Sequence, residues 1–208
     1  MKTILCYGDS NTWGYRPGTK DRYSRTERWV GVLQQELGTD YEVIAEGLNG
    51  RTTVWDDPIE GYKNGKEQLI PILTSHKPID LVTIMLGTND LKRRFGLGAY
   101  DIAEGAGTLV EIVQKSNCGP ENRAPQVLLI APPPVAQLTE YNEMFEGAAD
   151  KSRQFSHHYR RVAEELDCAF LDAGAFVVSS DLDGIHLDAS EHKKLGLAVA
   201  ARVREILG

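Results

Sequence analysis

One stretch of the chain decides its fold: Leu81-Val82-Thr83-Ile84-Met85-Leu86, followed directly by Gly87-Thr88-Asn89-Asp90. The apolar run has the length of a strand, and the glycine, asparagine and aspartate that follow it are turn formers. A strand without alternating polar positions is typical of a parallel sheet that helices cover on both faces. This stretch therefore predicts a buried central strand that ends in a polar loop.

Outward from this stretch, short apolar runs alternate with helical patterns. The other predicted strands span residues 4–7, 41–45, 127–130 and 168–171. Apolar residues recur at helical spacing within residues 29–37, 67–74, 100–115, 155–166 and 195–206. Asp188 precedes the last of these helices and Glu191 follows three residues later, which predicts a capping box. The alternation predicts a three-layer α/β/α protein with a five-stranded parallel sheet, in a single domain covering residues 1–208.

The composition places the chain among ordinary globular proteins. Of its 208 residues, 41% are hydrophobic and 25% are charged, which excludes a disordered, collagen-like or coiled-coil protein. Its 23 basic and 30 acidic residues give a net charge of -7, so we expect no nucleic-acid partner. No apolar run reaches the ~20 residues that span a bilayer, so we expect no membrane partner. The scattered Cys6, Cys118 and Cys168 lack metal-site spacing, which favours reduced thiols and a cytoplasmic location.

The loop after the first strand contains a candidate nucleophile. Parallel connections bring the carboxyl ends of all strands to one edge of the sheet, where such proteins bind their ligands. Gly8-Asp9-Ser10-Asn11-Thr12-Trp13-Gly14 places a serine at that edge. A serine hydroxyl needs a neighbouring base to remove its proton, so the catalytic interpretation requires a histidine nearby. The competing interpretation is a plain turn. A phosphate-binding loop fits poorly, because no lysine follows Gly14.

His186 is the histidine that best meets this requirement, since it lies in a glycine-containing loop after the last predicted strand. Asp183 precedes it by three residues, across Gly184. In so short a loop the carboxylate can fold back onto the imidazole and orient it as a base. Asp181 and Asp188 compete for this role, and spacing alone does not choose among the three carboxylates.

Two more strand-end loops offer donors to a developing oxyanion. Gly47 and Gly50 follow the second strand, and a glycine there lets a backbone N–H approach a substrate closely. Asn89 follows the third strand and carries a side-chain amide. Each residue is also an ordinary turn former. Together, a serine, a glycine, an asparagine and an Asp/His pair at four separate strand ends favour a catalytic site.

At these residues the sequence resembles the GDSL, or SGNH, hydrolase family, over nearly the whole chain. The family's blocks correspond in order to Gly8-Asp9-Ser10, Gly50, Gly87-Thr88-Asn89-Asp90 and Asp183-Gly184-Ile185-His186. The stretches around them are similar to the arylesterase/acyltransferase branch. Gly50 matches better than Gly47, because the family glycine is followed two residues later by threonine, here Thr52. Asn11 departs from the pattern, since the family name has leucine at this place.

The resemblance implies a flavodoxin-like fold and ester hydrolysis without a metal or another cofactor. Carried over residue by residue, Ser10 would be the nucleophile, His186 the general base and Asp183 its orienting partner. The backbone N–H groups of Ser10 and Gly50 and the side chain of Asn89 would form the oxyanion hole. The resemblance also implies a small ester as substrate and a homo-oligomer as the assembly.

The leading hypothesis is a serine esterase for short acyl groups such as acetyl, with transfer of the acyl group to an alcohol as a variant. The walls of a short acyl pocket would come from aromatic residues in or near the loops, Trp13, Tyr15, Trp55 and Phe95. Alternatives within the family are a carbohydrate O-deacetylase and a thioesterase or lysophospholipase. An alternative of another class is a non-catalytic doubly wound module that binds a nucleotide or flavin in the same crevice.

Overall fold

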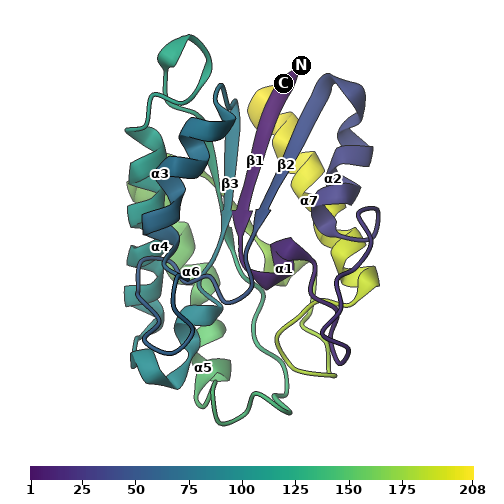
Figure 1. Cartoon of the computed structure of the whole chain (residues 1–208), viewed down its shortest axis with the longest axis vertical. Helices are drawn as coiled ribbons and strands as arrows, with labels where there is room; N and C mark the ends of the chain where they lie inside the picture. The colour runs from purple at the N-terminus through teal and green to yellow at the C-terminus, as the bar shows by residue number, and fades with distance from the viewer.

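A parallel five-stranded sheet runs through the centre of the molecule (Figure 1). The computed structural model describes all residues from 1 to 208. Its strands are β1 (Lys2–Gly8), β2 (Tyr41–Gly47), β3 (Leu81–Met85), β4 (Gln126–Ala131) and β5 (Ala169–Asp172), in the order β2-β1-β3-β4-β5. Each neighbouring pair is parallel, and this order is that of flavodoxin-like sheets. The predicted α/β fold is confirmed.

Helices cover both faces of the sheet, so the molecule has three layers (Figure 1). The α-helices are α1 (Ser10–Trp13), α2 (Trp29–Leu37), α3 (Gly65–His76), α4 (Ala99–Gln114), α5 (Ala148–Ser152), α6 (Phe155–Glu165) and α7 (Ala189–Leu207). Short 3-10 helices span Gly38–Asp40, Asn89–Leu91, Arg93–Phe95, Pro120–Asn122 and Ala173–Ala175. Figure 1 shows α2 and α7 on one side of the sheet, and α3, α4 and α6 on the other.

The side chains of β1 alternate between the two apolar cores. Leu5 and Tyr7 belong to the core under α3, α4 and α6, whereas Ile4 and Cys6 belong to the core under α2 and α7. All four are fully buried. Because both faces of the strand are covered, no polar position interrupts it, which is the pattern that the apolar runs of the sequence had indicated.

The start of α7 differs from its prediction. Asp188 is the N-cap residue, but its side chain makes no capping hydrogen bond. Its Oδ1 instead accepts a hydrogen bond from Ser180 Oγ at 3.0 Å. Glu191 accepts from the Val178 N–H at 3.1 Å and from Lys194 Nζ at 2.7 Å. The predicted capping box is therefore wrong, because both carboxylates bind partners in the preceding loop or in the next turn.

None of the helices combines the length and the apolar character required to cross a bilayer.

The direction of the strands determines where the loops that follow them lie. Since all five strands are parallel, the loops that follow β1, β2, β3 and β5 leave the sheet at the same edge.

Candidate active site

Ser10 lies two residues after the carboxyl end of β1, at the start of a short helix. It is the first residue of α1, and Asp9 caps that helix by accepting the Asn11 N–H at 2.9 Å on its Oδ1. The backbone N–H groups of Thr12 and Trp13 both bond to the carbonyl of Asp9, at 3.1 and 2.9 Å. Ser10 is only 7% exposed, so its hydroxyl is presented from a well-defined position.

His186 reaches Ser10 from the loop between β5 and α7, 176 residues further along the chain. Its Nε2 lies 3.0 Å from Ser10 Oγ, and its Nδ1 lies 2.7 Å from Asp183 Oδ2. With the Nδ1 proton donated to Asp183, the lone pair of Nε2 faces the serine hydroxyl. The structure thus joins the three residues in one chain of hydrogen bonds, which is the arrangement that activates a serine nucleophile.

The geometry chooses Asp183 among the three candidate carboxylates. Its Oδ1 accepts the N–H groups of Ile185 and His186, each at 2.9 Å, which folds the loop into a tight turn. Asp181 is exposed, and Asp188 binds Ser180. Burial by itself would raise the pKa of Asp183, but its hydrogen bonds and the His186 charge hold this pKa below its usual value. The carboxylate therefore stays ionised beside the imidazole.

Tyr15 restricts the histidine from the side. Its ring stacks on the imidazole of His186, with centroids 4.0 Å apart and planes 25° apart. Its hydroxyl lies 3.2 Å from the hydroxyl of Tyr141. The ring of Tyr141 lies edge-on to His186, with the two ring centroids 6.3 Å apart. The imidazole thus has one aromatic ring stacked on its face and a second ring near it edge-on, which restricts the orientation of its plane. The sequence indicated Tyr15 as a pocket wall; the structure places it against the proposed base.

The two candidate glycines after β2 have different surroundings. Gly50 lines the same cavity as Ser10 and His186, and its φ of 82° is a left-handed conformation that favours glycine. Gly47 packs against α1 instead, where an added Cβ would lie 2.1 Å from the backbone nitrogen of Trp13. Gly50 is thus the glycine that lines the cavity with Ser10, and Gly47 is the one that lets α1 approach the sheet.

Asn89 completes the group of candidate oxyanion donors. It lines the cavity with Ser10 and Gly50, and its Nδ2 donates to the carbonyl of Arg51 at 3.1 Å. The neighbouring Asp90 is fully buried and accepts the backbone N–H of Thr53 at 3.0 Å on Oδ1 and its hydroxyl at 2.5 Å on the same atom. These bonds fasten the loop after β3 to the loop after β2. Asp90 had no assigned role in the sequence, although it stands beside Asn89 in the same block.

Asn11 also contributes, at the position where the sequence departs from the family pattern. It is 2% exposed and lies between the loop that carries Ser10 and the loop that carries His186. Nδ2 donates to the Ile185 carbonyl at 3.3 Å, and Oδ1 accepts the Leu187 N–H at 3.1 Å. The departure was visible in the sequence, but the partners were not, because they lie 174 and 176 residues away.

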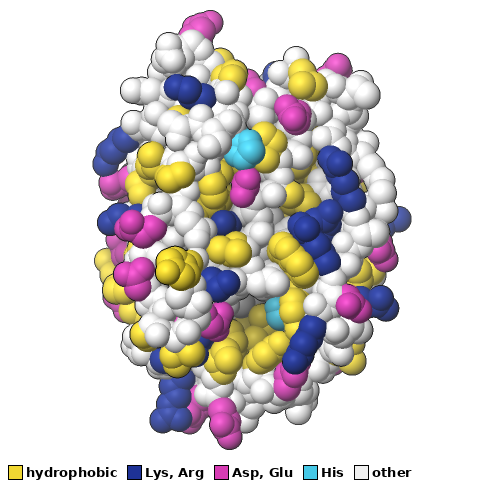
Figure 2. Space-filling model, in the orientation of Figure 1, with side chains coloured by type: hydrophobic (Ala, Val, Ile, Leu, Met, Phe, Trp, Pro, Cys, Tyr) yellow, Lys and Arg dark blue, Asp and Glu magenta, His cyan; other side chains and the backbone are white.

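The cavity beside Ser10 has a volume of about 130 Å³. Its lining consists of Ser10, Gly50, Glu60, Asn89, Lys92, Tyr141, Met144, Phe145, Ile185 and His186. Figure 2 shows a hollow on this face with hydrophobic side chains on its walls and a histidine at its rim. The expected wall of Trp13, Trp55 and Phe95 does not line this cavity. Its apolar wall comes from the segment 141–145 and from Ile185.

The charged part of the cavity wall belongs to a network of ion pairs. Lys92, only 3% exposed, lies 2.5 Å from Glu60 Oε1 and 3.4 Å from Asp57 Oδ2. Arg94 Nη2 lies 2.7 Å from each of the same two carboxylates. Although burial would raise the pKa of Asp57, hydrogen bonds from Arg94 and from two backbone N–H groups hold it well below its usual value. No group of three or more His, Cys, Asp or Glu side chains is arranged to hold a metal ion.

The comparison with protein families agrees with this geometry. The model of the GDSL-like lipase/acylhydrolase family matches residues 6–194, which include all four blocks. The chain belongs to the GDSL-like lipase/acylhydrolase family. The family predicted from the sequence is thereby confirmed, and with it the enzyme class of a carboxylic ester hydrolase. Among curated proteins, no sequence matches the chain significantly.

Solved structures of this GDSL-like hydrolase's relatives match over the full length. A carbohydrate acetylesterase from Sinorhizobium meliloti is 40% identical, with a TM-score of 0.97 and all of both chains covered. An aryl esterase from M. smegmatis is 41% identical, with a TM-score of 0.96 and again all of both chains covered. A lipase/acylhydrolase from Enterococcus faecalis is 19% identical, with a TM-score of 0.71, and the match covers 100% of this chain and 98% of that one. At this identity the match shows the shared fold alone.

Proposed function

We propose that residues 1–208 form one catalytic domain that hydrolyses short-chain carboxylic esters through an acyl-enzyme on Ser10. The observation that carries this proposal is the chain of two hydrogen bonds from Ser10 through His186 to Asp183, of 3.0 and 2.7 Å. The similarity over the whole chain to an aryl esterase and a carbohydrate acetylesterase supports it.

In this mechanism, Ser10 Oγ attacks the ester carbonyl carbon while its proton moves to His186 Nε2. The tetrahedral intermediate collapses, the C–O bond to the alcohol breaks, and the alcohol leaves with the proton from His186. Water then attacks the acyl-enzyme as His186 takes its proton, and the acid leaves as the proton returns to Ser10 Oγ. Throughout, Asp183 holds the imidazole in place and stabilises its positive charge.

The negative charge on the carbonyl oxygen needs donors that are already in position. We assign this role to the backbone N–H groups of Ser10 and Gly50 and to the side-chain amide of Asn89. All three residues line the cavity. One amide hydrogen of Asn89 already bonds to the Arg51 carbonyl, which orients the second one. The bonds from Thr53 to Asp90 keep the two donor loops at a fixed separation.

The size of the cavity supports a short acyl group. A water molecule occupies about 30 Å³ in the liquid, so a cavity of about 130 Å³ has room for a few non-hydrogen atoms. Phe145 and Ile185, which are 3% and 4% exposed, line it as fixed side chains of the core. An acetyl or propionyl group fits within such a space, whereas a long fatty acyl chain would extend beyond it.

The test is the hydrolysis of p-nitrophenyl esters from acetyl to decanoyl by the wild type and by Ser10→Ala. We expect turnover to be fastest with the short esters and to fall by about 10³-fold or more in the variant. Thr12→Val, which changes a hydroxyl in the same helix, is the matched control and should keep most of the activity. Turnover that survives Ser10→Ala unchanged would refute the mechanism and favour a binding module.

A carbohydrate O-deacetylase is the second candidate, and two charged residues of the cavity favour it. Glu60 and Lys92, which form an ion pair, line the cavity together with its apolar residues. Carboxylate and ammonium groups bind hydroxyls, of which an acetylated sugar carries several and phenyl acetate carries none. Acetylated xylose and phenyl acetate should be compared in the wild type and in Glu60→Gln. A selective rise in KM for the sugar would support the deacetylase.

Three finer features remain proposals. Acyl transfer follows if an alcohol replaces water at the acyl-enzyme, and it is measured as ester formation from added alcohol. A homo-oligomer is expected from the family, and light scattering on the purified protein measures it. A cytoplasmic location agrees with three unpaired cysteines, of which Cys6 is fully buried and has its pKa raised to about 12 by burial.

A further inference from the structure

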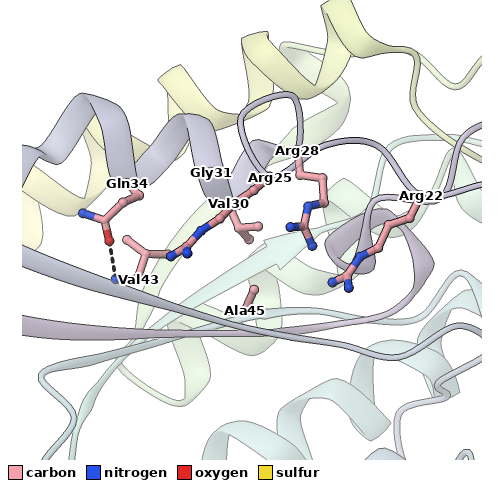
Figure 3. Close-up of a pocket in the computed structure, with 8 residues that line it drawn as sticks. All are labelled: Arg22, Arg25, Arg28, Val30, Gly31, Gln34, Val43 and Ala45. Carbon is pink, nitrogen blue, oxygen red and sulfur yellow. Dashed lines mark hydrogen bonds between the residues drawn. The ribbon is translucent and has the colours of Figure 1, made fainter.

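A second cavity, of about 260 Å³, lies at the edge of the sheet beside β2. Its lining consists of Arg22, Arg25, Arg28, Val30, Gly31, Gln34, Val43 and Ala45 (Figure 3). None of these residues lines the cavity at Ser10. Figure 3 shows the three arginine side chains reaching from the loop before α2 toward Val43 and Ala45 of β2. The cavity therefore combines one strand edge with three guanidinium groups.

The three arginines have no acidic partner, although the chain as a whole is acidic, with a net charge of -7. None of them takes part in an ion pair. Burial, together with the charges of Arg22 and Arg25, lowers the pKa of the Arg28 guanidinium. The other arginines of the strand-end loops differ: Arg94, for example, lies between two carboxylates. Arg22 and Arg25 are exposed and Arg28 is half-buried, so a solvent anion can reach all three guanidinium groups. Three like charges at one cavity favour the binding of such an anion.

The hydrogen-bonding groups of these arginines are also mostly unused. Arg22 donates its Nε–H to the Trp13 carbonyl at 2.8 Å, and Arg28 donates from Nη1 to the same carbonyl at 3.3 Å. The guanidinium group of Arg25 makes no hydrogen bond within the protein. The Nε of Arg28 is buried and has no hydrogen-bond partner. A buried donor without an acceptor is costly unless a ligand supplies one.

The remaining polar side chain of the cavity is fully engaged. Gln34 accepts the Val43 N–H at 2.8 Å, and its Nε2 donates to the carbonyls of Gly38 and Tyr41 at 3.0 and 2.9 Å. All free polar side-chain atoms in the cavity are therefore donors on positive groups. A ligand that satisfies them must offer acceptors and negative charge, with no need to donate.

We propose that the Arg22/Arg25/Arg28 cavity is a binding site for a small multivalent oxyanion, a molecule that carries phosphate or carboxylate groups. The guanidinium fork matches the oxygen pairs of both groups and binds them in a bidentate manner. At about 30 Å³ per water, a volume of about 260 Å³ accommodates such an anion with several waters. The site is separate from the proposed catalytic residues, so it does not depend on the proposed function.

Binding at this site would reach the nucleophile helix directly. The carbonyl that Arg22 and Arg28 share belongs to Trp13, the last residue of α1, whose first residue is Ser10. The Arg22 guanidinium also stacks on the ring of Trp13, 4.7 Å from its centroid. An anion that draws these two guanidinium groups into the cavity would change the contacts at the end of α1.

The test is calorimetric titration of the purified wild-type protein with inorganic phosphate and, separately, with citrate, each at matched ionic strength. The two probes distinguish phosphate from carboxylate chemistry. We expect saturable binding of at least one probe, weakened about 10-fold in Arg25→Gln and abolished in the Arg25→Gln/Arg28→Gln double variant. Arg25 makes no side-chain hydrogen bond, so its replacement removes the charge and leaves the fold intact. Ser10→Ala should bind the probe as the wild type does.

Arg123→Gln is the matched control, since Arg123 is an exposed arginine paired only with Glu121; it should bind the probe unchanged. A second readout needs no variant: the arginine Nε–Hε signals in NMR spectra of the wild type should shift on saturation, those of Arg25 and Arg28 most. The proposal is overturned if neither probe binds at about 10 mM, or if Arg25→Gln and Arg123→Gln bind equally well.

Discussion

The side chain of Asn11 is hydrogen-bonded to the backbone on both sides of His186. Oδ1 accepts the N–H of Leu187 at 3.1 Å, and Nδ2 donates to the carbonyl of Ile185 at 3.3 Å. Asn11 directly follows Ser10, so a single side chain connects the proposed nucleophile with the segment that carries its base. Because the distance between Ser10 Oγ and His186 Nε2 decides whether the proton can move, this connection bears on catalysis.

The first prediction concerns Asn11→Leu, which introduces the leucine of the family pattern. The exchange leaves the buried N–H of Leu187 without an acceptor, which costs about 1–3 kcal/mol of folding stability. It also frees the His186 segment, and a shift of about 1 Å at a catalytic group can lower the rate about 10²-fold. We expect kcat on p-nitrophenyl acetate to fall about 10-fold or more, with KM little changed. A lower melting temperature with an unaltered kcat would assign Asn11 to stability alone.

The second prediction concerns Asn89→Ala. The amide that Asn89 directs into the cavity should stabilise the transition state more than the bound ester, since negative charge develops only there. We expect kcat to fall about 10²–10³-fold while KM stays within a few-fold. Steady-state kinetics with p-nitrophenyl acetate measure both. Asn142→Ala, at an exposed position of the 132–147 loop, is the control. A rise in KM at constant kcat would show that Asn89 binds the ground state instead.

A buried histidine outside the proposed catalytic residues links the stability of the fold to pH. His192 is fully buried in α7; its Nδ1 accepts the N–H of Trp29 at 3.4 Å, and its Nε2 has no partner. Burial, together with the charges of His186 and Arg28, lowers the pKa of His192 to about 4. In the unfolded chain a histidine titrates at about 6.5. Between these two values the unfolded state binds more protons than the folded state.

The third prediction follows from this difference. On acidification from pH 6.5 to pH 4, protonation of His192 in the unfolded chain should remove about 3 kcal/mol of stability. His192→Gln should abolish this part of the pH dependence, and urea unfolding across the range measures it. Burial raises the pKa values of Asp9 and Asp90 to about 6, so their protonation on acidification stabilises the folded state. This contribution is the same in the wild type and in His192→Gln. If the exposed His157→Gln flattens the profile equally, His192 is not the cause.

The sequence predicted the fold and the proposed catalytic residues because both depend on local features. The apolar run of β3 and the loop of Ser10 follow from strand length, turn chemistry and the rule that parallel strands end at one edge. Asp183 and His186 are three residues apart, so their hydrogen bond needs only a tight turn. Spacing left Asp181 and Asp188 open as well, and the family resemblance selected Asp183. Such relationships can be read along the chain without knowledge of the packing.

The parts that the sequence could not supply depend on contacts between distant segments. The capping box at Asp188 fitted the local pattern, but Ser180 competes for the carboxylate. The apolar wall of the cavity comes mainly from residues 141–145, a loop segment without a periodic sequence pattern. Trp13 and Trp55 were expected in the wall only because they lie in or near the strand-end loops. Trp13 instead stacks with Arg22, and Trp55 is 37% exposed.

The fourth prediction concerns Phe145, which forms part of that wall. Its side chain is 3% exposed and lines the cavity next to Met144. Phe145→Ala should extend the acyl pocket, so that longer acyl chains gain a place to bind. Since each methylene in an apolar pocket changes the rate about 10-fold or more, the ratio of kcat/KM for hexanoyl over acetyl ester should rise at least about 10-fold.

Loss of this buried ring also costs about 3–5 kcal/mol of stability, so the melting temperature of Phe145→Ala must be measured beside its kinetics. Phe145→Leu retains most of the packing and should show a smaller shift of the same sign. Phe176, which is 48% exposed, provides the control, because Phe176→Ala should leave the acyl preference unchanged. If both Phe145 variants keep the wild-type preference while remaining folded, the acyl group lies elsewhere in the cavity, against the charged side formed by Glu60 and Lys92.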